Sequence, residues 1–458
     1  MARTGTKDSR GPRYVALQVL CAVDVEGAYV QIALDNQFKR SSLVRRDRGF
    51  ATELVYGTLR RRLTLDWILA RFSRRPLEAM PATLRNNLRM ALYQLVFLNS
   101  IPPAIVCNEA VELAKKVGHR GTVSFVNGVL RAILRNPDRM DYVKAAECMA
   151  TAESISLLHS HPLWLVNTWI QELGTDETKR LCASNNQVPS TFFRANTLKI
   201  SRDELIEELT SAGLNVGPGR LAPEAVKVEA PSGISRLASF EAGDFAVQDE
   251  AAMLVAHALA PAPRGIVYDL CAGLGGKTLH LAALMENNGQ VLAFDIHGGK
   301  LQALGKMADR LGVKNVRRVE ADATRLPREY LGKADGVLLD APCSGWGVIG
   351  RKPDIRWRMR PEHSEGLVML QRQLLETAYA CLLSGGRLVY STCTIHRKEN
   401  QENVEWLLDK YSDLELLMAR AQLPYSAWDY LEEDGPMLQL LPHRHGTDGF
   451  FIAVLEKS

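Results

Sequence analysis

Two cysteines, Cys343 and Cys393, each follow a short apolar run that is typical of a buried parallel strand. The first stands in Asp340-Ala-Pro-Cys-Ser-Gly345 and the second in Tyr390-Ser-Thr-Cys-Thr394. Side chains at the carboxyl ends of parallel strands meet at the edge of the sheet where ligands bind. A thiolate is a strong nucleophile, and a neighbouring carboxylate such as Asp340 can hold or move a proton. The spacing therefore predicts nucleophilic chemistry at one sheet edge.

A glycine-rich loop follows a third apolar run, in Asp269-Leu-Cys-Ala-Gly-Leu-Gly-Gly-Lys-Thr278. Its glycines allow the backbone to pass close beneath a ligand. Two nucleotide-binding patterns fit only in part. A dinucleotide fingerprint requires glycine where Thr278 stands, and a P-loop, which Gly276-Lys277-Thr278 would complete, requires glycine where Cys271 stands. A third candidate is the loop after the first strand of an S-adenosylmethionine (AdoMet) methyltransferase, which needs no pyrophosphate cradle.

Acidic residues follow the next three apolar runs. Asp295 lies about 20 positions after the loop and suits ribose hydroxyls. Asp322 follows the next run, where it would reach an adenine amino group, and Asp340 would lie beside the transferable methyl group. Each residue alone could be a strand-end turn or a helix cap. Together with the loop, in register with one sheet, they favour a cofactor site.

Carbon-5 of cytosine or uracil is a poor nucleophile. A thiolate that adds to carbon-6 turns the ring into an enamine, so that carbon-5 can attack the AdoMet methyl group. An acidic group near ring N3 assists, and a base then removes the carbon-5 proton before the thiol leaves. Asp340 with either Cys343 or Cys393 would supply the first two groups, and the residues alone leave both thiols open.

Three regions position these groups. Residues 1–142 have apolar side chains at three- and four-residue spacing, interrupted by prolines, and predict an all-helical bundle. Residues 143–245 predict linker helices and a small α+β module of RRM or ferredoxin-like type, in which Ser201 caps a helix. Residues 246–458 alternate apolar strands and helices, which predicts a doubly wound, mostly parallel, Rossmann-like sheet.

Composition limits the class of protein. A chain of 458 residues is long enough for two or three domains. The eight cysteines include no C-x-x-C pair, so we expect no metal site. No apolar stretch is long enough to cross a bilayer, and the amino terminus lacks the apolar segment of a secretory signal. We expect a cytoplasmic protein with reduced thiols and no membrane partner.

The net charge of +4 is unevenly distributed. Residues 1–140 carry 23 Lys and Arg against 11 Asp and Glu, and the remainder carries 33 against 41. A basic first third predicts a polyanion-binding module, with solvated arginine faces as an equal alternative. A second basic segment, residues 351–360, suits phosphates and base stacking, or is a solvated loop with one packed tryptophan. The candidate nucleic-acid contacts are Arg45, Arg46, Arg48, Arg61, Arg62, Arg351, Lys352, Arg356 and Trp357.

The two thiol motifs and the glycine loop together resemble the RNA cytosine-5 methyltransferases of the NOL1/NOP2/Sun family. The resemblance extends to residues 245–249, 353–355 and 445–451. The first third is similar to the NusB-like RNA-binding domain, through residues 47–48, 54–60, 101–103 and 126–131. This pairing points to the branch that acts on 16S ribosomal RNA, and the resemblance covers nearly the whole chain.

The resemblance implies a class I AdoMet methyltransferase domain and a role for each thiol. Cys393 would be the nucleophile, and Cys343 would assist release of the methylated RNA. DNA cytosine-5 methyltransferases attack through a Pro-Cys thiol instead. The substrate would be 16S ribosomal RNA, naked or in an early small-subunit particle. The implied AdoMet contacts are Cys271, Ala272, Gly273, Leu274, Gly275, Gly276, Lys277, Asp295, Asp322 and Asp340.

Three positions depart from the family pattern. Leu274 replaces the usual proline of the glycine loop, and Trp346 and Gly350 stand where threonine and a basic residue are common. The first would relax the loop, and the other two lie near the expected RNA side.

Two other functions fit parts of the sequence. A P-loop NTPase would use residues 276–278 with Asp340, and a non-catalytic RNA-binding or antitermination factor would use the NusB-like region alone. Two thiols at strand ends have no purpose in a pure binding protein.

Overall fold

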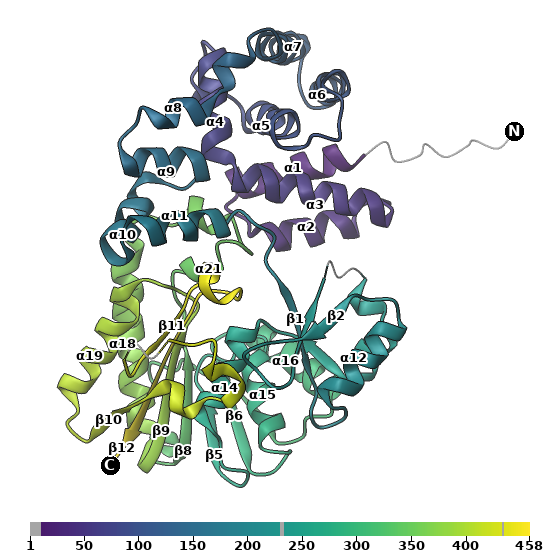
Figure 1. The fold of residues 1–458 in the computed structure, drawn as a ribbon. Coiled ribbons are helices and arrows are strands. Elements are labelled where there is room, and N and C mark those ends of the chain that lie inside the picture. The colour runs from purple at the N-terminus through teal and green to yellow at the C-terminus, as the bar shows by residue number, and fades with distance from the viewer. Residues whose placement is uncertain (1–10, 230–232, 433–434) are drawn as a thin grey trace, which may run out of the picture. The chain divides into compact units, whose positions relative to one another are not determined.

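The computed structural model describes residues 11–229, 233–432 and 435–458 (Figure 1). Residues 1–10, on which the expectation of no secretory signal rests, lie outside the described residues. The chain forms two compact units. The first contains residues 1–187 and 352–358, and the second contains residues 188–351 and 359–458. Within the described ranges no helix has the length and apolar character needed to cross a bilayer. The expected domain boundaries at residues 142 and 245 stay a prediction.

The first unit is built from helices, as its apolar spacing predicts. They are α1 (Pro12–Val25), α2 (Val30–Lys39), α3 (Arg45–Arg60), α4 (Arg62–Phe72), α5 (Ala82–Phe97), α6 (Pro103–Val117), α7 (Arg120–Arg135), α8 (Tyr142–Glu147), α9 (Thr151–His159), α10 (Leu163–Leu173), α11 (Thr175–Ser184) and α17 (Ile355–Arg358).

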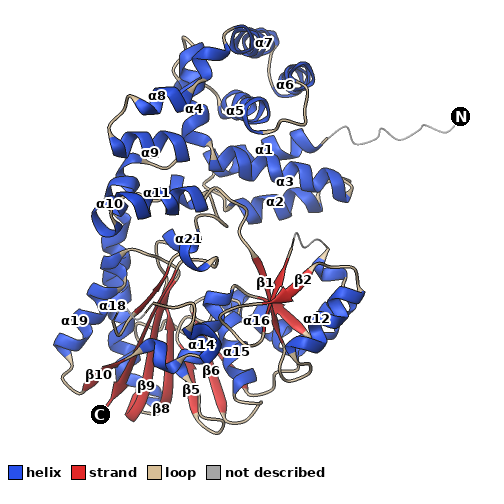
Figure 2. Cartoon of the chain, in the orientation of Figure 1, coloured by secondary structure: helices blue, strands red, loops and turns tan. Residues whose placement is uncertain are grey.

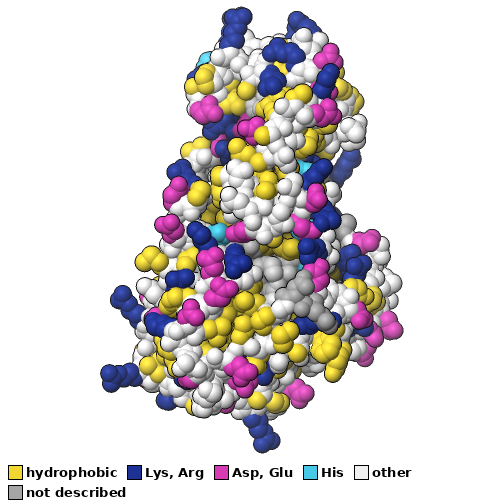
Figure 3. All heavy atoms as spheres, turned by 60° about the vertical axis from the view of Figure 1, so that its left-hand side comes forward, with side chains coloured by type: hydrophobic (Ala, Val, Ile, Leu, Met, Phe, Trp, Pro, Cys, Tyr) yellow, Lys and Arg dark blue, Asp and Glu magenta, His cyan; other side chains and the backbone are white. Residues whose placement is uncertain are grey.

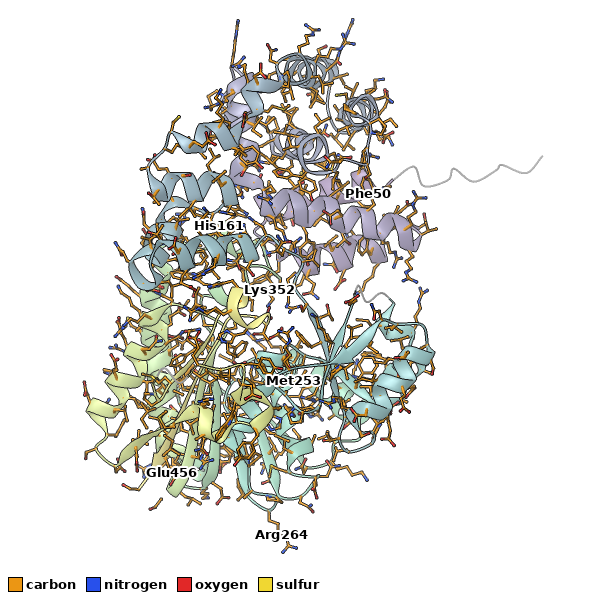
Figure 4. All side chains as sticks on the ribbon, viewed as in Figure 1. Phe50, His161, Met253, Arg264, Lys352 and Glu456 are labelled. Carbon is orange, nitrogen blue, oxygen red and sulfur yellow. The ribbon has the colours of Figure 1, made fainter. Side chains whose placement is uncertain are left out.

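Apolar faces and proline positions explain these helices. Leu17, Leu54 and Leu88 come from α1, α3 and α5 and meet in one buried core. Pro103 occupies the first turn of α6, where its missing N–H removes no helical hydrogen bond. Phe50 of α3, labelled in Figure 4, packs on the edge of the core beneath the guanidinium of Arg13, whose central carbon lies 5.0 Å from the ring centroid.

A small antiparallel sheet opens the second unit, and we call residues 191–247 the four-stranded module. Its strand order is β2-β3-β1-β4. Ser201 caps α12 as predicted: its backbone N–H donates to Glu204 Oε2 at 2.9 Å, and its Oγ accepts from the Glu204 N–H at 3.3 Å. The elements are β1 (Thr191–Ala195), α12 (Arg202–Ser211), β2 (Val216–Pro218), β3 (Ala225–Val228), α13 (Ala238–Ala242) and β4 (Phe245–Val247).

The rest of the second unit is a large mixed sheet with the order β10-β12-β9-β8-β5-β6-β7, and β11 pairs with β12. Strands β5 to β9 are mutually parallel, and β12 runs antiparallel to β9 and β10. The predicted doubly wound sheet is confirmed. Its elements are α14 (Glu250–Leu259), β5 (Ile266–Asp269), α15 (Gly276–Leu284), β6 (Gln290–Asp295), α16 (Gly298–Leu311), β7 (Val316–Glu320), β8 (Ala334–Asp340), α18 (His363–Cys381), β9 (Leu382–Thr392), α19 (Gln401–Lys410), β10 (Leu414–Leu417), α20 (Tyr425–Trp428), β11 (Leu438–Leu440), α21 (Pro442–His445) and β12 (Phe450–Lys457).

Helices cover both faces of this sheet (Figure 2). Helices α14, α15 and α16 share one core with the sheet, which contains Met253, labelled in Figure 4. Helices α18 and α19 share the other core. Val267 of β5 points into the first core and Tyr268 into the second, as alternation along a strand requires. Because β5 to β9 are parallel, their carboxyl ends and the residues that follow share one edge.

Candidate active site

The glycine-rich loop leaves β5 at Asp269 and enters α15 at Gly276. Gly273 and Gly275 have φ values of +56° and +90°, in the left-handed region that only glycine adopts without strain. A Cβ atom on Gly275 would come within 2.4 Å of Leu304 Cγ, so α16 packs directly against the loop. The loop therefore has one tightly defined backbone path.

Asp269 anchors the inner side of this loop. Its Oδ2 accepts a hydrogen bond of 2.6 Å from Thr278 Oγ1, and its Oδ1 accepts one of 3.4 Å from the Cys271 N–H. Burial raises the pKa of Asp269 to about 7, although the Thr278 hydrogen bond opposes this rise. Asp269 was not among the expected site residues, and its only signal in the sequence is its place at the end of the first strand.

The two following strand ends lie on the same edge. Asp295 Oδ2 accepts from the Gly273 N–H at 3.0 Å, and Oδ1 accepts from the His297 N–H at 2.8 Å, so β6 and the glycine loop are joined directly. Asp322 follows β7 and is exposed. Its Oδ1 accepts from Thr324 Oγ1 at 2.7 Å, and this hydrogen bond lowers the pKa of Asp322.

Asp340 joins the glycine loop to the ends of β8 and β9. Its Oδ2 accepts from Lys277 Nζ at 2.7 Å, and its Oδ1 accepts from Ser391 Oγ at 3.2 Å. The Lys277 ammonium also lies 4.7 Å from the centroid of the Phe450 ring. In a P-loop the equivalent lysine faces the phosphates. Here it pairs with the carboxylate that precedes the first thiol.

The two predicted thiols meet. Cys343 Sγ lies 3.3 Å from Cys393 Sγ, because β8 and β9 are adjacent parallel strands with Asp340 in register with Ser391. The hydrogen bond with Cys393 and burial raise the pKa of Cys343 well above its usual range, and the Glu399 carboxylate raises it further. Cys343 therefore keeps its proton at neutral pH.

A buried carboxylate holds the loop of Cys343. Glu399 Oε2 accepts from the Ser344 N–H at 2.9 Å and from Gln371 Nε2 at 2.9 Å. Gln371 Nε2 also donates to the Pro342 carbonyl at 2.9 Å. The residues on both sides of Cys343 are thus fixed by two side chains that are themselves fully buried.

A second set of hydrogen bonds holds the loop of Cys393. Asn400 accepts from Thr392 Oγ1 at 2.6 Å and donates to the Thr394 carbonyl at 3.0 Å. Glu399, Gln371 and Asn400 were absent from the expected site. The sequence carries one weak signal for them, the Glu399-Asn400 pair shortly after the second thiol and before a helix.

The segment 445–451 is linked to Cys393 through the backbone of Gly347. The Gly347 N–H donates to the Cys393 carbonyl at 3.1 Å, and the Gly449 N–H donates to the Gly347 carbonyl at 2.8 Å. A Cβ atom on Gly347 would come within 2.0 Å of the Gly449 carbonyl oxygen. Glycine at 347 is therefore required by the close approach of three backbone segments.

Arg351 is held by protein groups. It donates through Nε to Asp448 Oδ2 at 2.9 Å and through Nη2 to Asp249 Oδ2 at 3.0 Å and to the Ser190 carbonyl at 3.1 Å. Burial and the neighbouring Asp448 carboxylate raise the pKa of Asp249 to about 7. These bonds join the motifs at 245–249 and 445–451, and the expected RNA contact at Arg351 is not supported by them.

The three departures from the family pattern take different positions. Leu274 is 58% exposed on the glycine loop. Trp346 is buried and stacks on His396, with ring centroids 4.3 Å apart. Gly350 lies in the turn before Arg351.

Three of the residues expected to contact RNA lie at the start of helix α3 in the first unit. Arg45, Arg46 and Arg48 are exposed in the first turn of α3. Cations are unfavourable at the positive end of a helix dipole. Arg48 nevertheless has local partners: its Nε donates to the Leu43 carbonyl at 3.0 Å, and its guanidinium lies 5.6 Å from the Phe38 ring centroid. On the face seen in Figure 3, the described lysine and arginine side chains lie among acidic ones and form no single basic patch.

Two further expected RNA contacts of the first unit, Arg356 and Trp357, donate hydrogen bonds to backbone carbonyls of the same unit. Arg356 is 1% exposed and donates to the Arg60, Ser160 and Asn185 carbonyls at 3.1, 3.1 and 3.2 Å. Trp357 Nε1 donates to the Leu59 carbonyl at 2.8 Å. These bonds leave Arg356 unable to reach a phosphate, so its expected role is not supported.

Arg61 and Arg62 also stack on aromatic rings. The guanidinium of Arg61 lies 4.8 Å from the Phe97 ring centroid, and that of Arg62 lies 5.4 Å from the Trp357 ring centroid. Lys352, labelled in Figure 4, is exposed.

Comparison with known families assigns all three regions of the chain. The profile described as 16S rRNA methyltransferase RsmB/F matches residues 256–456, that of the NusB family matches residues 10–135, and that of the RsmF/B-like ferredoxin-like domain matches residues 161–235. The expected NusB-like bundle, ferredoxin-like module and methyltransferase domain are thereby confirmed.

Individual relatives are similar over the full length. A protein of Bacillus subtilis named probable ribosomal RNA small subunit methyltransferase B is 37% identical over 460 residues, which is 100% of both chains. The crystal structure of the protein PH0851 superposes with a TM-score of 0.81 at 29% identity and covers 99% of this chain and 100% of that one. The structure of NSun6 from Pyrococcus horikoshii with SFG has a TM-score of 0.57 at 27% identity and covers 64% of this chain and 97% of that one.

Proposed function

The chain belongs to the 16S rRNA methyltransferase RsmB/F family, and from that membership we propose that it methylates carbon-5 of one cytosine in 16S ribosomal RNA with AdoMet as donor. The observation that carries the proposal is the pair of thiols. Cys343 and Cys393 lie 3.3 Å apart beside Asp340, and Asp340 is bonded to the lysine of the glycine loop. An NTPase or a binding protein would have no use for such a pair.

The glycine loop and the strand ends fit AdoMet. Gly273 and Gly275 give the loop a backbone that a ligand can approach closely, and Asp295 follows the second strand, where ribose hydroxyls bind in such sheets. Each oxygen of the Asp295 carboxylate receives one backbone N–H and retains acceptor capacity for a hydroxyl. The related NSun6 structure carries SFG, an AdoMet analogue. When bound, AdoMet supplies the methyl group.

Cys393 would act as the nucleophile. Its thiolate sulfur forms a bond to carbon-6 of the cytosine, and the electron pair of the 5,6 double bond becomes available at carbon-5. The Cys343 thiol, which keeps its proton, can donate a hydrogen bond to the Cys393 sulfur and so stabilise its thiolate. Asp340 would hold the N3 side of the ring, with Lys277 keeping the carboxylate oriented.

Release of the methylated base requires that carbon-5 lose its proton and that the Cys393 sulfur leave carbon-6. After methylation the carbon-5 proton passes to a base, the 5,6 double bond re-forms, and the bond between carbon-6 and Cys393 breaks. The electron pair of the broken bond leaves on the Cys393 sulfur. We assign Cys343 the role of donating a hydrogen bond to this departing sulfur, which lies 3.3 Å from its own, while a separate base takes the carbon-5 proton. The two loops must stay fixed through both steps, and Glu399, Gln371 and Asn400 hold them.

The first unit would bring the RNA. Arg45, Arg46 and Arg48 form an exposed basic turn that adds sequence-independent, salt-dependent affinity for phosphates. The target cytosine must leave its stack to reach a thiol and a methyl donor together.

Bisulfite mapping of 16S ribosomal RNA from cells with and without the gene tests the function. We expect one cytosine to lose its protection in the deletion strain and to regain it with the wild-type gene but not with Cys393→Ala. Methylation of naked RNA and of early small-subunit particles by the purified enzyme then identifies the substrate. Unchanged protection in the deletion strain would refute the proposal.

A further inference from the structure

Helix α15, which follows the glycine loop, is held from outside by the four-stranded module. Arg194 of β1 donates through Nη1 to the Gly276 carbonyl at 2.8 Å and to Gln248 Oε1 at 2.5 Å. Gly276 is the first residue of α15, so this bond reaches the point where the loop becomes a helix.

A second contact lies one turn further along the same helix. Glu224, directly before β3, accepts a hydrogen bond of 2.8 Å from His280 Nε2 through Oε1. Its Oε2 accepts one of 3.0 Å from His257 Nε2 of α14. Positions 276 and 280 are four residues apart and share one helix face. The module therefore contacts α15 at two successive turns of that face.

These contacts are buried and charged. Arg194, Glu224 and His280 are 3%, 5% and 2% exposed. Burial opposes the charge of Glu224, but the His280 and His257 imidazoles hold the pKa of Glu224 far below its usual value. Burial and the nearby Arg194 lower the pKa of His280 to about 4, so it is neutral at physiological pH. Removing one member of such a set leaves a desolvated partner without its hydrogen bond.

The cluster resembles a metal site in composition. One ligand atom each of Glu224, His257 and His280 lie within 4.8 Å of one another. Both carboxylate oxygens, however, already accept imidazole N–H groups, and the Arg194 guanidinium supplies the positive charge nearby. The Nε2 atoms of both histidines are thus paired with the Glu224 carboxylate, while His280 Nδ1 has no hydrogen-bond partner among the described residues. An added dication at the carboxylate would displace the bonds that hold α15.

We propose that Arg194 and Glu224 are positioning residues for AdoMet, which fix the glycine loop by holding α15 at Gly276 and His280. The hydrogen bond from Thr278 to Asp269 fixes the inner side of the loop. The contacts of Arg194 and Glu224 with α15 fix its outer side. The inference rests on the proposed function, because it concerns the same cofactor. It gives the four-stranded module a part in cofactor affinity that is independent of RNA.

Calorimetric titration of the full-length protein with S-adenosylhomocysteine, without RNA, tests this inference. We expect Arg194→Met to raise the Kd about tenfold and Glu224→Gln to raise it in the same direction. Arg194→Lys, which keeps a cation near the Gly276 carbonyl, should recover part of the affinity. Lys227→Met is the matched control, because Lys227 is exposed on β3 of the same module and should leave the Kd unchanged.

Steady-state kinetics separate positioning from general damage. In Arg194→Met the KM for AdoMet should rise about tenfold, while the KM for RNA stays the same, at a temperature where circular dichroism shows both proteins folded. An unchanged Kd for S-adenosylhomocysteine in folded Arg194→Met and Glu224→Gln, or an equal rise in the KM for RNA, would overturn the inference. Stoichiometric zinc in the purified wild type would also overturn it. A wild type that binds no S-adenosylhomocysteine would overturn the proposed function and this inference with it.

Discussion

Cys343 Sγ and Cys393 Sγ lie 3.3 Å apart on loops that leave two adjacent parallel strands. At this distance either thiol can donate a hydrogen bond to the other sulfur, and a thiolate on one sulfur would oppose ionisation of its neighbour. The pair can share a single proton, with the thiolate on one sulfur and the thiol on the other. Both states have a use in the proposed mechanism, in which a sulfur adds to a ring and later leaves it.

The two thiols should fail in different ways when replaced. With RNA and AdoMet, Cys343→Ala should accumulate a covalent protein–RNA adduct, because the nucleophile remains and release is impaired. Cys393→Ala should give neither adduct nor methylated product. Denaturing gels with labelled RNA measure the adduct, and tritium transfer measures methylation. Methylation by Cys393→Ala at the wild-type rate would show that another group is the nucleophile.

Glu399 should stabilise the loop of Cys343. Glu399→Ala leaves the buried Ser344 N–H without its acceptor and removes one of the two acceptors of Gln371 Nε2, so the free energy of unfolding should fall by about 2 kcal/mol. The methylation rate should fall with it, since Cys343 loses its fixed position. Urea titration and initial rates measure the two effects. Glu405→Gln, at an exposed position of α19, is the control. Equal behaviour of the two variants would exclude a structural role for Glu399.

Gly347 should tolerate no side chain. Gly347→Ala places a Cβ atom 2.0 Å from the Gly449 carbonyl oxygen, so the backbone behind Cys393 must shift. We expect a loss of about 1–3 kcal/mol in unfolding free energy and a lower kcat. Gly366→Ala, in α18 with open space around the new Cβ, should be neutral or stabilising by up to about 1 kcal/mol. Thermal unfolding compares the pair, and a stable, active Gly347→Ala enzyme would contradict the packing described.

Asp269 predicts a pH dependence of stability. Burial raises its folded-state pKa to about 7, well above the value of about 3.9 in the unfolded chain. A raised pKa contributes stability that is complete below the unfolded value and is lost as pH rises through the folded value. Between pH 4 and 7 the wild type should therefore lose stability relative to Asp269→Asn, by up to about 4 kcal/mol.

Urea titrations of both proteins at a series of pH values measure this difference. Asp249, whose pKa is also raised to about 7, titrates in the same range and is present in both proteins, so the comparison cancels it. Parallel pH profiles would mean that Asp269 ionises normally in the folded protein.

Arg356 should act on stability and leave the salt dependence of RNA binding unchanged. It donates to the carbonyls of Arg60, Ser160 and Asn185, each at the end of a helix, so Arg356→Met should cost about 3 kcal/mol or more. The exposed Lys352→Met in the same segment should cost little. Arg46→Ala, in contrast, should reduce the slope of log K against log salt by about one. A smaller slope of log K against log salt in Arg356→Met than in the wild type would show that Arg356 does contact phosphate.

The sheet and the thiol pair were predictable from the sequence because buried parallel strands leave continuous apolar runs that end in aspartate or glycine. The strands that carry Asp269, Asp295 and Asp340 were found for this reason. Adjacent order of β8 and β9 then brings Cys343 and Cys393 together. The roles of the two thiols came from family resemblance, since either sulfur fits the chemistry.

The supporting residues could not be predicted, because their partners are distant in the chain. Gln371 is an ordinary polar residue of a helix until Pro342 and Glu399 are placed beside it. Arg356 has the sequence surroundings of an RNA contact, with cations and a tryptophan nearby. Its burial is decided by helix ends contributed by Arg60 and Ser160, far earlier in the chain.

The helical unit is discontinuous in sequence, since residues 352–358 belong to it together with residues 1–187. During synthesis the helices up to α11 leave the ribosome first, and Arg356 follows about ten to thirty seconds later at ordinary elongation rates. Until Arg356 is synthesised, the carbonyls of Arg60, Ser160 and Asn185 must accept hydrogen bonds from water or from another donor. By the time this unit can close, Cys343 has already been translated. The last segment of the helical unit is therefore synthesised only after Cys343.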